Sequence, residues 1–432
     1  MEMSKDFELR CVLCNRRFSE GEVEYTCPHC GLNGTLDVIY DYGQARKELN
    51  KEAPGSLEDW KSGMWRYWPI LPVHRREHIP PLAVGGTPLY ENKVVASKYG
   101  VKRFLVKDDG RNPTGSLKDR ASAVAVARAL DLGREHISCS STGNAASSLS
   151  GFAAVTSRGA TIFVPESAPV AKITQLLVYG ARVVLVKGDY KDAFELSVKA
   201  IDHFGWYNRN CAVNPYLVEG KKTCGLEIAE ELGWQVPDYL FVSVGDGCII
   251  SSMYKAFYDL VNLGMVDCYP KIIGVQAEGC SPVYHAVKNN LSKVAPAQKS
   301  DTLADSISVR APRNWAKALR AVKETGGSMV AVKDEEILDA MKELAVNTGV
   351  FAEPAGAAAY AGFCKMAAEE ELDSGATAVV VATGNGLKDI SGARKAVGPP
   401  LVTRADLGEF IEVIKESSVV GKNFCRSLEA RN

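Results

Sequence analysis

Short apolar runs recur along the chain from about residue 104 and are separated by segments long enough for helices. The runs are rich in β-branched residues, as expected for strands of a parallel sheet that is covered on both faces. An Ala-rich pattern over residues 116–132 predicts a helix that ends before Gly133. The sequence therefore predicts an α/β fold. The expected strands are residues 104–106, 161–164, 182–186, 239–242, 271–275 and 376–381.

The first forty residues follow a different pattern, with two Cys-x2-Cys pairs separated by twelve residues. Four thiolates at this spacing are typical of a tetrahedral structural zinc site. We therefore expect a zinc-ribbon-like module over residues 1–40, with one structural zinc and a last strand at 36–40. The alternative is four unligated surface cysteines. The expected metal ligands are Cys11, Cys14, Cys27 and Cys30.

Composition narrows the classes of partner. A formal net charge of −1 over 432 residues gives no argument for a basic surface that would bind nucleic acid or an anionic membrane. No apolar run reaches the roughly 18 residues that span a bilayer, and the start lacks the apolar segment of a secretion signal. The other eight cysteines are scattered singly, which favours a reducing compartment. We expect a cytoplasmic protein that acts on a small molecule, with no nucleic-acid or membrane partner.

One lysine is placed where a reactive amine is expected. Residues 112–115 form a predicted turn, and Lys118 falls in the first turn of the helix that follows. Nearby backbone N–H groups disfavour a charged amine, which helps to keep it nucleophilic. Taken alone, such a lysine is more often an ordinary solvated residue. The other motifs of the chain favour the reactive interpretation.

The segment 112–120 resembles the lysine motif of threonine synthases, within the fold-type-II pyridoxal-phosphate enzymes that are similar to the tryptophan synthase β subunit. The resemblance covers about residues 80–397. It implies that Lys118 holds pyridoxal 5'-phosphate and is the general base at the substrate Cα. Four further segments match in the same order, namely 141–144, 213–215 with 219–223, 351–355 and 383–389.

The resemblance also implies a domain organisation. Two parallel-sheet α/β domains would hold the cofactor in the cleft between them. We expect an N-terminal arm at 41–79, with Trp60, Trp65 and Trp68 packed on the main body, and a catalytic region at 80–432. A smaller mobile domain at about 135–190 would be inserted in the larger one. By analogy with the family, the protein would be a homodimer.

Further residues would bind the cofactor. The Gly245–Cys248 turn precedes a helical pattern, and a glycine-containing turn at a helix N-terminus suits a phosphate. Asp246 is an awkward neighbour for a dianion, so it either turns away or caps the helix. By resemblance, Asn144 bonds the phenolic oxygen of the cofactor and Thr383 lies opposite its ring nitrogen. The expected cofactor-binding residues are Lys118, Asn144, Gly245, Asp246, Gly247, Cys248, Ile249 and Thr383.

The substrate would be held by a polar run and a lysine. Ser141, Thr142 and Gly143 would bind the substrate carboxylate, although the same run is also typical of a turn that caps the helix starting near Ala145. Lys221 would supply positive charge, with Lys172 and Lys222 as further candidates. Relatives carry polar or cationic groups for a substrate phosphate where this chain has Ala145, Cys211, Ala212, Leu217 and Ser308. The sequence therefore predicts an altered phosphate pocket.

Three functions are compatible with these motifs. The first is a lyase of the threonine synthase type, nominally converting O-phosphohomoserine and water to threonine and phosphate. The second is a threonine or serine ammonia-lyase, whose substrate hydroxyl needs no large cationic pocket. The third is a ligand sensor or scaffold without catalysis, in which the cysteine module contacts another protein.

Overall fold

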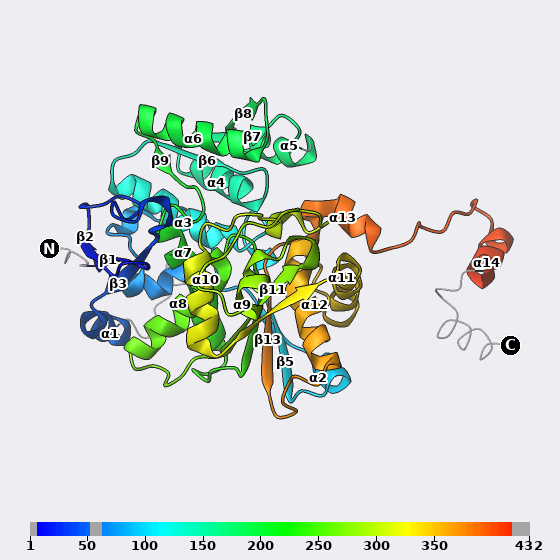
Figure 1. The fold of residues 1–432 in the computed structure, drawn as a ribbon. Coiled ribbons are helices and arrows are strands. Elements are labelled where there is room, and N and C mark those ends of the chain that lie inside the picture. The colour runs from blue at the N-terminus through cyan, green and yellow to red at the C-terminus, as the bar shows by residue number, and fades with distance from the viewer. Residues whose placement is uncertain (1–6, 52–62, 169, 417–432) are drawn as a thin grey trace.

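A computed structural model describes residues 7–51, 63–168 and 170–416, so Trp60 lies outside the described residues. These residues form three sheets (Figure 1). The N-terminal sheet is antiparallel, in the order β2-β1-β3, and the other two are almost entirely parallel. Its strands are β1 (Phe7–Cys11), β2 (Arg17–Ser19) and β3 (Leu36–Tyr40).

The N-terminal sheet is docked on the main body through a buried carboxylate. Asp37 in β3 is 4% exposed and pairs with Lys317 (3.1 Å) and Arg320 (2.7 Å) of α10 (Trp315–Thr325). Beyond the sheet lie α1 (Tyr42–Lys51) and the 3-10 segment η3 (Gly63–Ile70). In η3, Trp65 and Trp68 are buried in the main core cluster, as expected of the arm.

The largest sheet has the order β12-β11-β10-β13-β5-β4. All its pairs are parallel except β4 with β5, which makes β4 an antiparallel edge strand. This arrangement confirms the α/β class. The strands are β4 (Leu89–Glu91), β5 (Arg103–Asp108), β10 (Tyr239–Ser243), β11 (Lys271–Ala277), β12 (Ser328–Val332) and β13 (Thr377–Ala382).

Helices cover both faces of this sheet. Successive residues of a strand point to opposite faces, so alternate residues of one strand belong to different core clusters. Leu240 and Val242 of β10 belong to one core cluster, whereas Tyr239 and Phe241 belong to the other. The first cluster includes α3 (Lys118–Asp131), α7 (Tyr216–Glu231), α8 (Cys248–Asn262), α9 (Pro282–Lys288) and α10. The second includes α2 (Lys93–Tyr99), α11 (Asp334–Thr348) and α12 (Pro354–Ala368).

A second parallel sheet, in the order β8-β7-β6-β9, lies with its helices above the large sheet in Figure 1. It runs to Asn208, past the boundary expected near residue 190, because α6 and β9 belong to it. Three of its strands fall within 135–190, where two were expected. The strands are β6 (His136–Ser140), β7 (Gly159–Pro165), β8 (Arg182–Val186) and β9 (Tyr207–Asn208), and the helices are α4 (Asn144–Val155), α5 (Val170–Val178) and α6 (Tyr190–Phe204).

The remaining elements are short or peripheral. Near the C-terminal end of the described chain, α13 (Ile390–Lys395) lies on the body, and α14 (Leu407–Glu416) stands apart from it in Figure 1. Within the described ranges, no helix combines the length and apolarity needed to cross a membrane. The other 3-10 turns are η1 (Gly31–Asn33), η4 (Arg76–His78), η5 (Asp109–Arg111), η6 (Glu278–Cys280), η7 (Asp305–Ile307) and η8 (Gly386–Asp389).

Candidate active site

Most of the residues expected to carry chemistry follow the carboxyl ends of parallel strands. The segment containing Lys118 follows β5, the Gly245–Cys248 turn follows β10 and Thr383 follows β13. The run 141–144 follows β6 of the second sheet. In open α/β folds, ligands bind in the crevice at this end of the strands. The topology thus places four predicted segments where a ligand site is expected.

Backbone hydrogen bonds join the Lys118 segment to the Thr383 loop. Leu117 N donates to Thr383 O (2.9 Å), and Asn385 N donates to Gly115 O (2.9 Å). Lys118 is the first residue of α3 and is partly buried. These bonds fix the start of α3 beside the end of β13.

The surroundings of the Lys118 amine favour its neutral form. Burial lowers its pKa, and the positive charges of Lys221 and Arg209 lower it further, against the opposing effect of Cys211 and Glu353. The sequence analysis also expected a lowered pKa for Lys118, from its place at a helix start. In the structure, burial and the charge of Lys221 are the main causes of the lowering. A neutral amine at this position is a nucleophile and a proton acceptor.

Asn144 is held by a carboxyl group that sequence reasoning did not single out as functional. Its Nδ2 donates to Glu353 Oε1 (2.7 Å), at the start of α12. Burial raises the pKa of Glu353, although the neighbouring Lys118 charge opposes that rise. A Cβ at Gly384 would lie 2.6 Å from Glu353 Oε1, so only glycine leaves room for this pair. The amide of Asn144 keeps a second N–H for a ligand.

The Gly245–Cys248 turn has the geometry of an anion-binding helix start. Gly247 has a φ of +88° and caps α8, and a Cβ there would lie 3.0 Å from Asn314 O. Glycine is therefore required both by the backbone conformation and by the close contact. The turn presents the N-terminus of α8, fifteen residues long, towards the crevice.

Asp246 turns away from the helix it precedes. Its Oδ1 accepts a hydrogen bond from Arg313 N (2.6 Å), and the α8 cap has no side-chain hydrogen bond. Of the two arrangements expected, the carboxyl group adopts the first. Burial raises the pKa of Asp246 to about 7, which makes it less repulsive to an anion than an ordinary carboxylate.

Lys221 is the lysine that remains available to a ligand. It is completely buried, and its Nζ has no hydrogen-bond partner among the described residues. Lys222, by contrast, pairs with Glu219 and with Asp259 (2.5 Å) and lies outside the site. Lys172 is paired with Asp305. The expectation of three spare lysines is therefore wrong for two of them, because their charges are already compensated.

Arg209 and Cys211 lie close to Lys118 and were not expected as site residues. Arg209 is completely buried, and its Nη1 donates to Cys211 Sγ (3.3 Å). In the sequence, the only sign of the contact between Arg209 and Cys211 was that Cys211 replaces a polar residue of the family pattern.

The run expected to bind a carboxylate forms the loop before α4. Ser141, Thr142 and Gly143 are partly exposed, and Gly143 N donates to Ser141 Oγ (3.2 Å). Gly143 is the N-cap of α4 and no side chain caps this helix, so its first N–H groups remain for a ligand. The loop is thus compatible with both the turn interpretation and the ligand interpretation.

Three of the altered positions carry no cation for a substrate phosphate. Leu217 is 1% exposed within the main core cluster, and Ser308 shares a hydrogen bond with Ser300. Ala145, the second residue of α4, has no polar side chain. Lys221 and Arg209 are the buried cations whose charges lower the pKa of Lys118.

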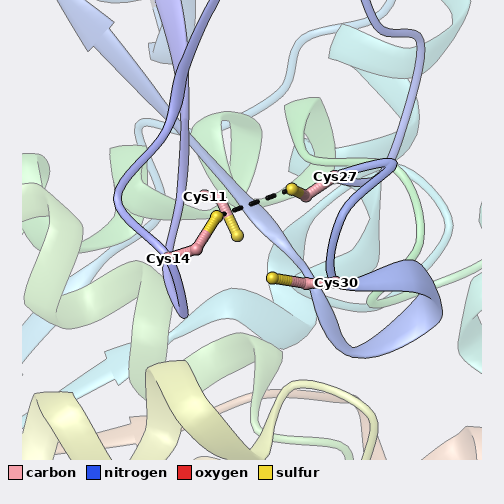
Figure 2. A group of neighbouring side chains, drawn as sticks. All are labelled: Cys11, Cys14, Cys27 and Cys30. Carbon is pink, nitrogen blue, oxygen red and sulfur yellow. Dashed lines mark hydrogen bonds between the residues drawn. The ribbon is translucent and has the colours of Figure 1, made fainter.

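The four paired cysteines come together at one end of the N-terminal sheet (Figure 2). Their Sγ atoms all lie within 4.8 Å of one another, and Cys14 Sγ is 3.7 Å from Cys27 Sγ. Gly31, with a φ of +61°, closes the second pair. This cluster has the donor set of a closed tetrahedral metal site.

Known sequences similar to this chain are pyridoxal-phosphate-dependent enzymes. The profile of the family described as pyridoxal-phosphate dependent enzyme matches residues 81–384. Threonine synthase of Methanocaldococcus jannaschii is 37% identical over 408 residues, which cover 94% of this chain and 99% of the relative. Threonine synthase of Methanosarcina acetivorans is 37% identical over 94% of this chain and 98% of its own. That of Halalkalibacterium halodurans is 35% identical over 83% and 99%.

Solved structures share the fold at low sequence identity. Threonine deaminase isoform 2 from Solanum lycopersicum aligns with a TM-score of 0.61 at 22% identity, covering 72% of this chain and 87% of that one. Diaminopropionate ammonia lyase from Escherichia coli aligns with a TM-score of 0.62 at 15% identity, covering 92% and 98%. These structural similarities support the α/β fold, whereas the family assignment rests on the sequence relatives. The chain belongs to the threonine synthase family of pyridoxal-phosphate-dependent enzymes.

Proposed function

We propose that the protein is a lyase that eliminates an anionic leaving group from an amino acid and adds water, nominally converting O-phosphohomoserine to threonine and phosphate. The observation that carries this proposal is a lysine of lowered pKa beside a buried, unpartnered Lys221 at the carboxyl ends of the strands. The threonine synthase relatives favour the synthase reaction. The ammonia-lyase alternative is supported by fold similarity alone.

The residues present fit pyridoxal 5'-phosphate. A dianion at the α8 N-terminus would satisfy the orphaned Lys221 ammonium, whose burial without a partner is otherwise costly. Lys118 would hold the aldehyde, Asn144 the phenolic oxygen, and Thr383 the ring nitrogen. The backbone N–H groups from Gly245 to Ile249 would hold the phosphate.

The bound cofactor supplies an electron sink that stabilises negative charge at the substrate Cα. The other steps belong to the chain. Lys118, neutral in its buried setting, removes and returns the proton at Cα. Glu353 orients Asn144 through their 2.7 Å hydrogen bond. The Thr383 hydroxyl would donate to the ring nitrogen without protonating it, which would favour elimination and replacement over transamination.

We assign the substrate carboxylate to the loop of Ser141, Thr142 and Gly143 at the α4 N-terminus. In the absence of the arginine found in relatives at the position of Leu217, we assign Lys221, a buried cation without a hydrogen-bond partner among the described residues, to the leaving group as well as to the cofactor. A single lysine is a point charge and lacks the forked donor geometry of arginine. The proposed substrate pocket is therefore weaker towards a phosphate ester than that of a typical threonine synthase.

Substrate incubation tests the proposal. The cofactor-loaded protein is incubated separately with O-phosphohomoserine and with threonine, and inorganic phosphate, ammonia and 2-oxobutyrate are measured. Phosphate release with threonine formation supports the synthase reaction. Ammonia and 2-oxobutyrate from threonine would contradict it in favour of the lyase alternative. No product from either substrate, in a protein that fails to take up the cofactor, would favour a sensor or scaffold.

Replacing Lys221 with methionine should separate stability from binding. Removing a buried ammonium that lacks a partner should leave the unfolding free energy of the cofactor-free protein unchanged or higher. Cofactor affinity should fall by about 10- to 150-fold, the value of one charged hydrogen bond of about 1.5–3 kcal/mol. Denaturant unfolding and cofactor titration measure the two quantities.

Lys172→Met is the matched control because Lys172 is already paired with Asp305. It should leave cofactor affinity within about twofold of the wild type. Equal losses of affinity in the two variants would contradict the assignment of Lys221.

We further propose that the cysteine cluster binds one structural zinc ion. The four Sγ atoms within 4.8 Å of one another form a donor set typical of such sites. The zinc would hold β1–β3 in the shape that presents Asp37 to Lys317 and Arg320.

The cytoplasmic location and the homodimer expected by analogy stay predictions, and light scattering tests the homodimer.

Losing the zinc should unfold the N-terminal sheet before the main body. Structural zinc contributes of the order of 10 kcal/mol to the folding of small modules, so Cys14→Ser should expose β1–β3 to rapid hydrogen exchange. Metal analysis should find one zinc per wild-type chain and less in the variant. Cys268→Ser removes an exposed thiol outside the cluster and should change neither result. Wild-type protein without zinc but with protected β1–β3 would contradict the proposal.

A further inference from the structure

A single lysine side chain joins three parts of the proposed active site. Lys388 lies in η8, in the same loop as Thr383. Its Nζ donates to Thr114 O (2.9 Å), Ser147 Oγ (3.0 Å) and Gln175 Oε1 (3.0 Å). An ammonium group has three N–H donors, so each donor has one acceptor. The acceptors lie 274, 241 and 213 residues away in the sequence, so only the fold brings them to this lysine.

These acceptors belong to segments that carry proposed site residues. Thr114 lies in the turn before α3, whose first residue is Lys118. Ser147 is in the first turn of α4, whose first residue is Asn144. The third acceptor is carried by α5, another helix of the second parallel sheet. Lys388 therefore ties the start of α3 to two helices that belong to the other sheet.

The turn, the lysine stem and α4 are packed closely together at this junction. A Cβ at Gly115 would lie 3.3 Å from Lys388 Cδ. A Cβ at Gly151 of α4 would lie 2.9 Å from Thr114 Cγ2. Glycine at both positions lets the three parts approach each other. The Lys388 hydrogen bonds therefore belong to a close-packed contact between the two sheets' segments and not to a loose surface.

Two buried carboxyl groups compensate the Lys388 charge. Burial lowers the pKa of Lys388, but attraction to Glu353 and Asp119 opposes the lowering. Glu353 also accepts the hydrogen bond from Asn144 (2.7 Å). Asp119 accepts one from Thr114 N (2.6 Å). The two carboxyl groups that compensate this ammonium thus also hold the α4 start and the turn before α3.

We propose that Lys388 is a positioning residue that holds α4, and with it the loop assigned to the substrate carboxylate, at a fixed distance from Lys118. This inference rests on the proposed function. In that reaction a proton moves between Lys118 and the substrate Cα, while the carboxylate attached to Cα is held at the start of α4. A displacement of α4 by about 1 Å misaligns the two and costs about 100-fold in rate. The cofactor phosphate is assigned to the start of α8, so its binding depends little on Lys388.

The first test measures kcat and KM for O-phosphohomoserine, and the cofactor Kd, in Lys388→Met. With cofactor in excess, kcat should fall about 100-fold, while KM and the cofactor Kd stay within about threefold of the wild type, because the binding groups remain and only their alignment is lost. Lys395→Met removes an exposed lysine of α13 and should keep all three values. A wild-type kcat in Lys388→Met, or a loss that more cofactor restores, would overturn the proposal.

A double-mutant cycle tests whether the contact with α4 carries the effect. Ser147→Ala removes the acceptor on α4 and should lower kcat about tenfold, as expected for one hydrogen bond to a charged group. In the Lys388→Met background the same change should have no further effect, because both residues act through one contact. Effects that simply multiply would assign Lys388 a role within its own loop and would contradict the proposal.

A second measurement does not depend on turnover. Hydrogen exchange of the cofactor-free protein should speed up at least about tenfold in α4 and α5 of Lys388→Met, whereas β10 and β11 of the large sheet should exchange as in the wild type. If Lys388→Met does not fold, Gln175→Leu replaces it, because this change removes only the acceptor on α5, and exchange should then speed up in α5. Unchanged exchange in these helices would overturn the inference.

The two measurements also separate this inference from the proposed function. A wild type that turns over neither O-phosphohomoserine nor threonine would refute the proposed function. The exchange rates of α4 and α5 would then decide by themselves whether Lys388 holds these helices to the Lys118 segment.

Discussion

Replacing Lys118 with alanine should abolish the visible absorbance of the bound cofactor and lower turnover by at least about 10⁴-fold, the upper range for loss of a general base. Lys118 is the amine whose pKa is lowered by burial and by Lys221, so no neighbouring group has the same combination of position and charge state. Absorbance spectroscopy and steady-state kinetics measure the two effects.

Lys342→Ala is the control for this prediction because Lys342 is an exposed lysine on α11. It should keep both the spectrum and the turnover. An unchanged spectrum in Lys118→Ala would assign the covalent bond to another lysine.

Replacing Arg120 with methionine should lower the unfolding free energy by about 3–5 kcal/mol, because it leaves the buried carboxylate of Asp109 without a cation and leaves Glu227 with Lys107 (2.9 Å) as its buried partner. Arg120 is completely buried and bonds Asp109 (2.7 and 2.8 Å) and Glu227 (2.7 Å). Burial alone would lower the pKa of Arg120, but these two carboxylates raise it. The pair fixes α3, and hence Lys118, to α7. Denaturant unfolding measures the change.

The exposed pair of Arg103 and Glu91 provides the comparison. Their side chains are 34% and 39% exposed and lie 2.9 Å apart. Arg103→Met should cost less than about 1 kcal/mol because water screens the pair. A cost for Arg120→Met as small as that for Arg103→Met would show that the buried network does not stabilise the start of α3.

The sequence pattern predicted the elements with the strongest local signal. The strand expected at 182–186 matches β8, and the one expected at 36–40 matches β3. Six strands of the described residues escaped prediction, namely β1, β2, β4, β6, β9 and β12, and three of them show why. The short edge strand Leu89–Glu91 depends on pairing with β5, His136–Ser140 is rich in polar residues, and Ser328–Val332 is a short run between longer helical patterns. Tertiary pairing decides such segments.

The candidate site was predictable where a local motif carries its chemistry. Lys118, the Gly245–Cys248 turn and the four paired cysteines are each recognisable from neighbouring residues. The Asn144–Glu353 contact joins positions 209 residues apart, and no local pattern indicates such a pair. The same holds for Lys222, whose neutralisation by Asp259 becomes visible only when α7 and α8 are packed together. Sequence therefore gives the chemical groups, and the fold decides which of them remain free.

The most direct measurement is borohydride reduction of the cofactor-loaded protein followed by peptide mapping. The account predicts one pyridoxyl group per chain, attached to Lys118. A label on another lysine, or no label on a protein that is otherwise folded and supplied with the cofactor, would contradict it.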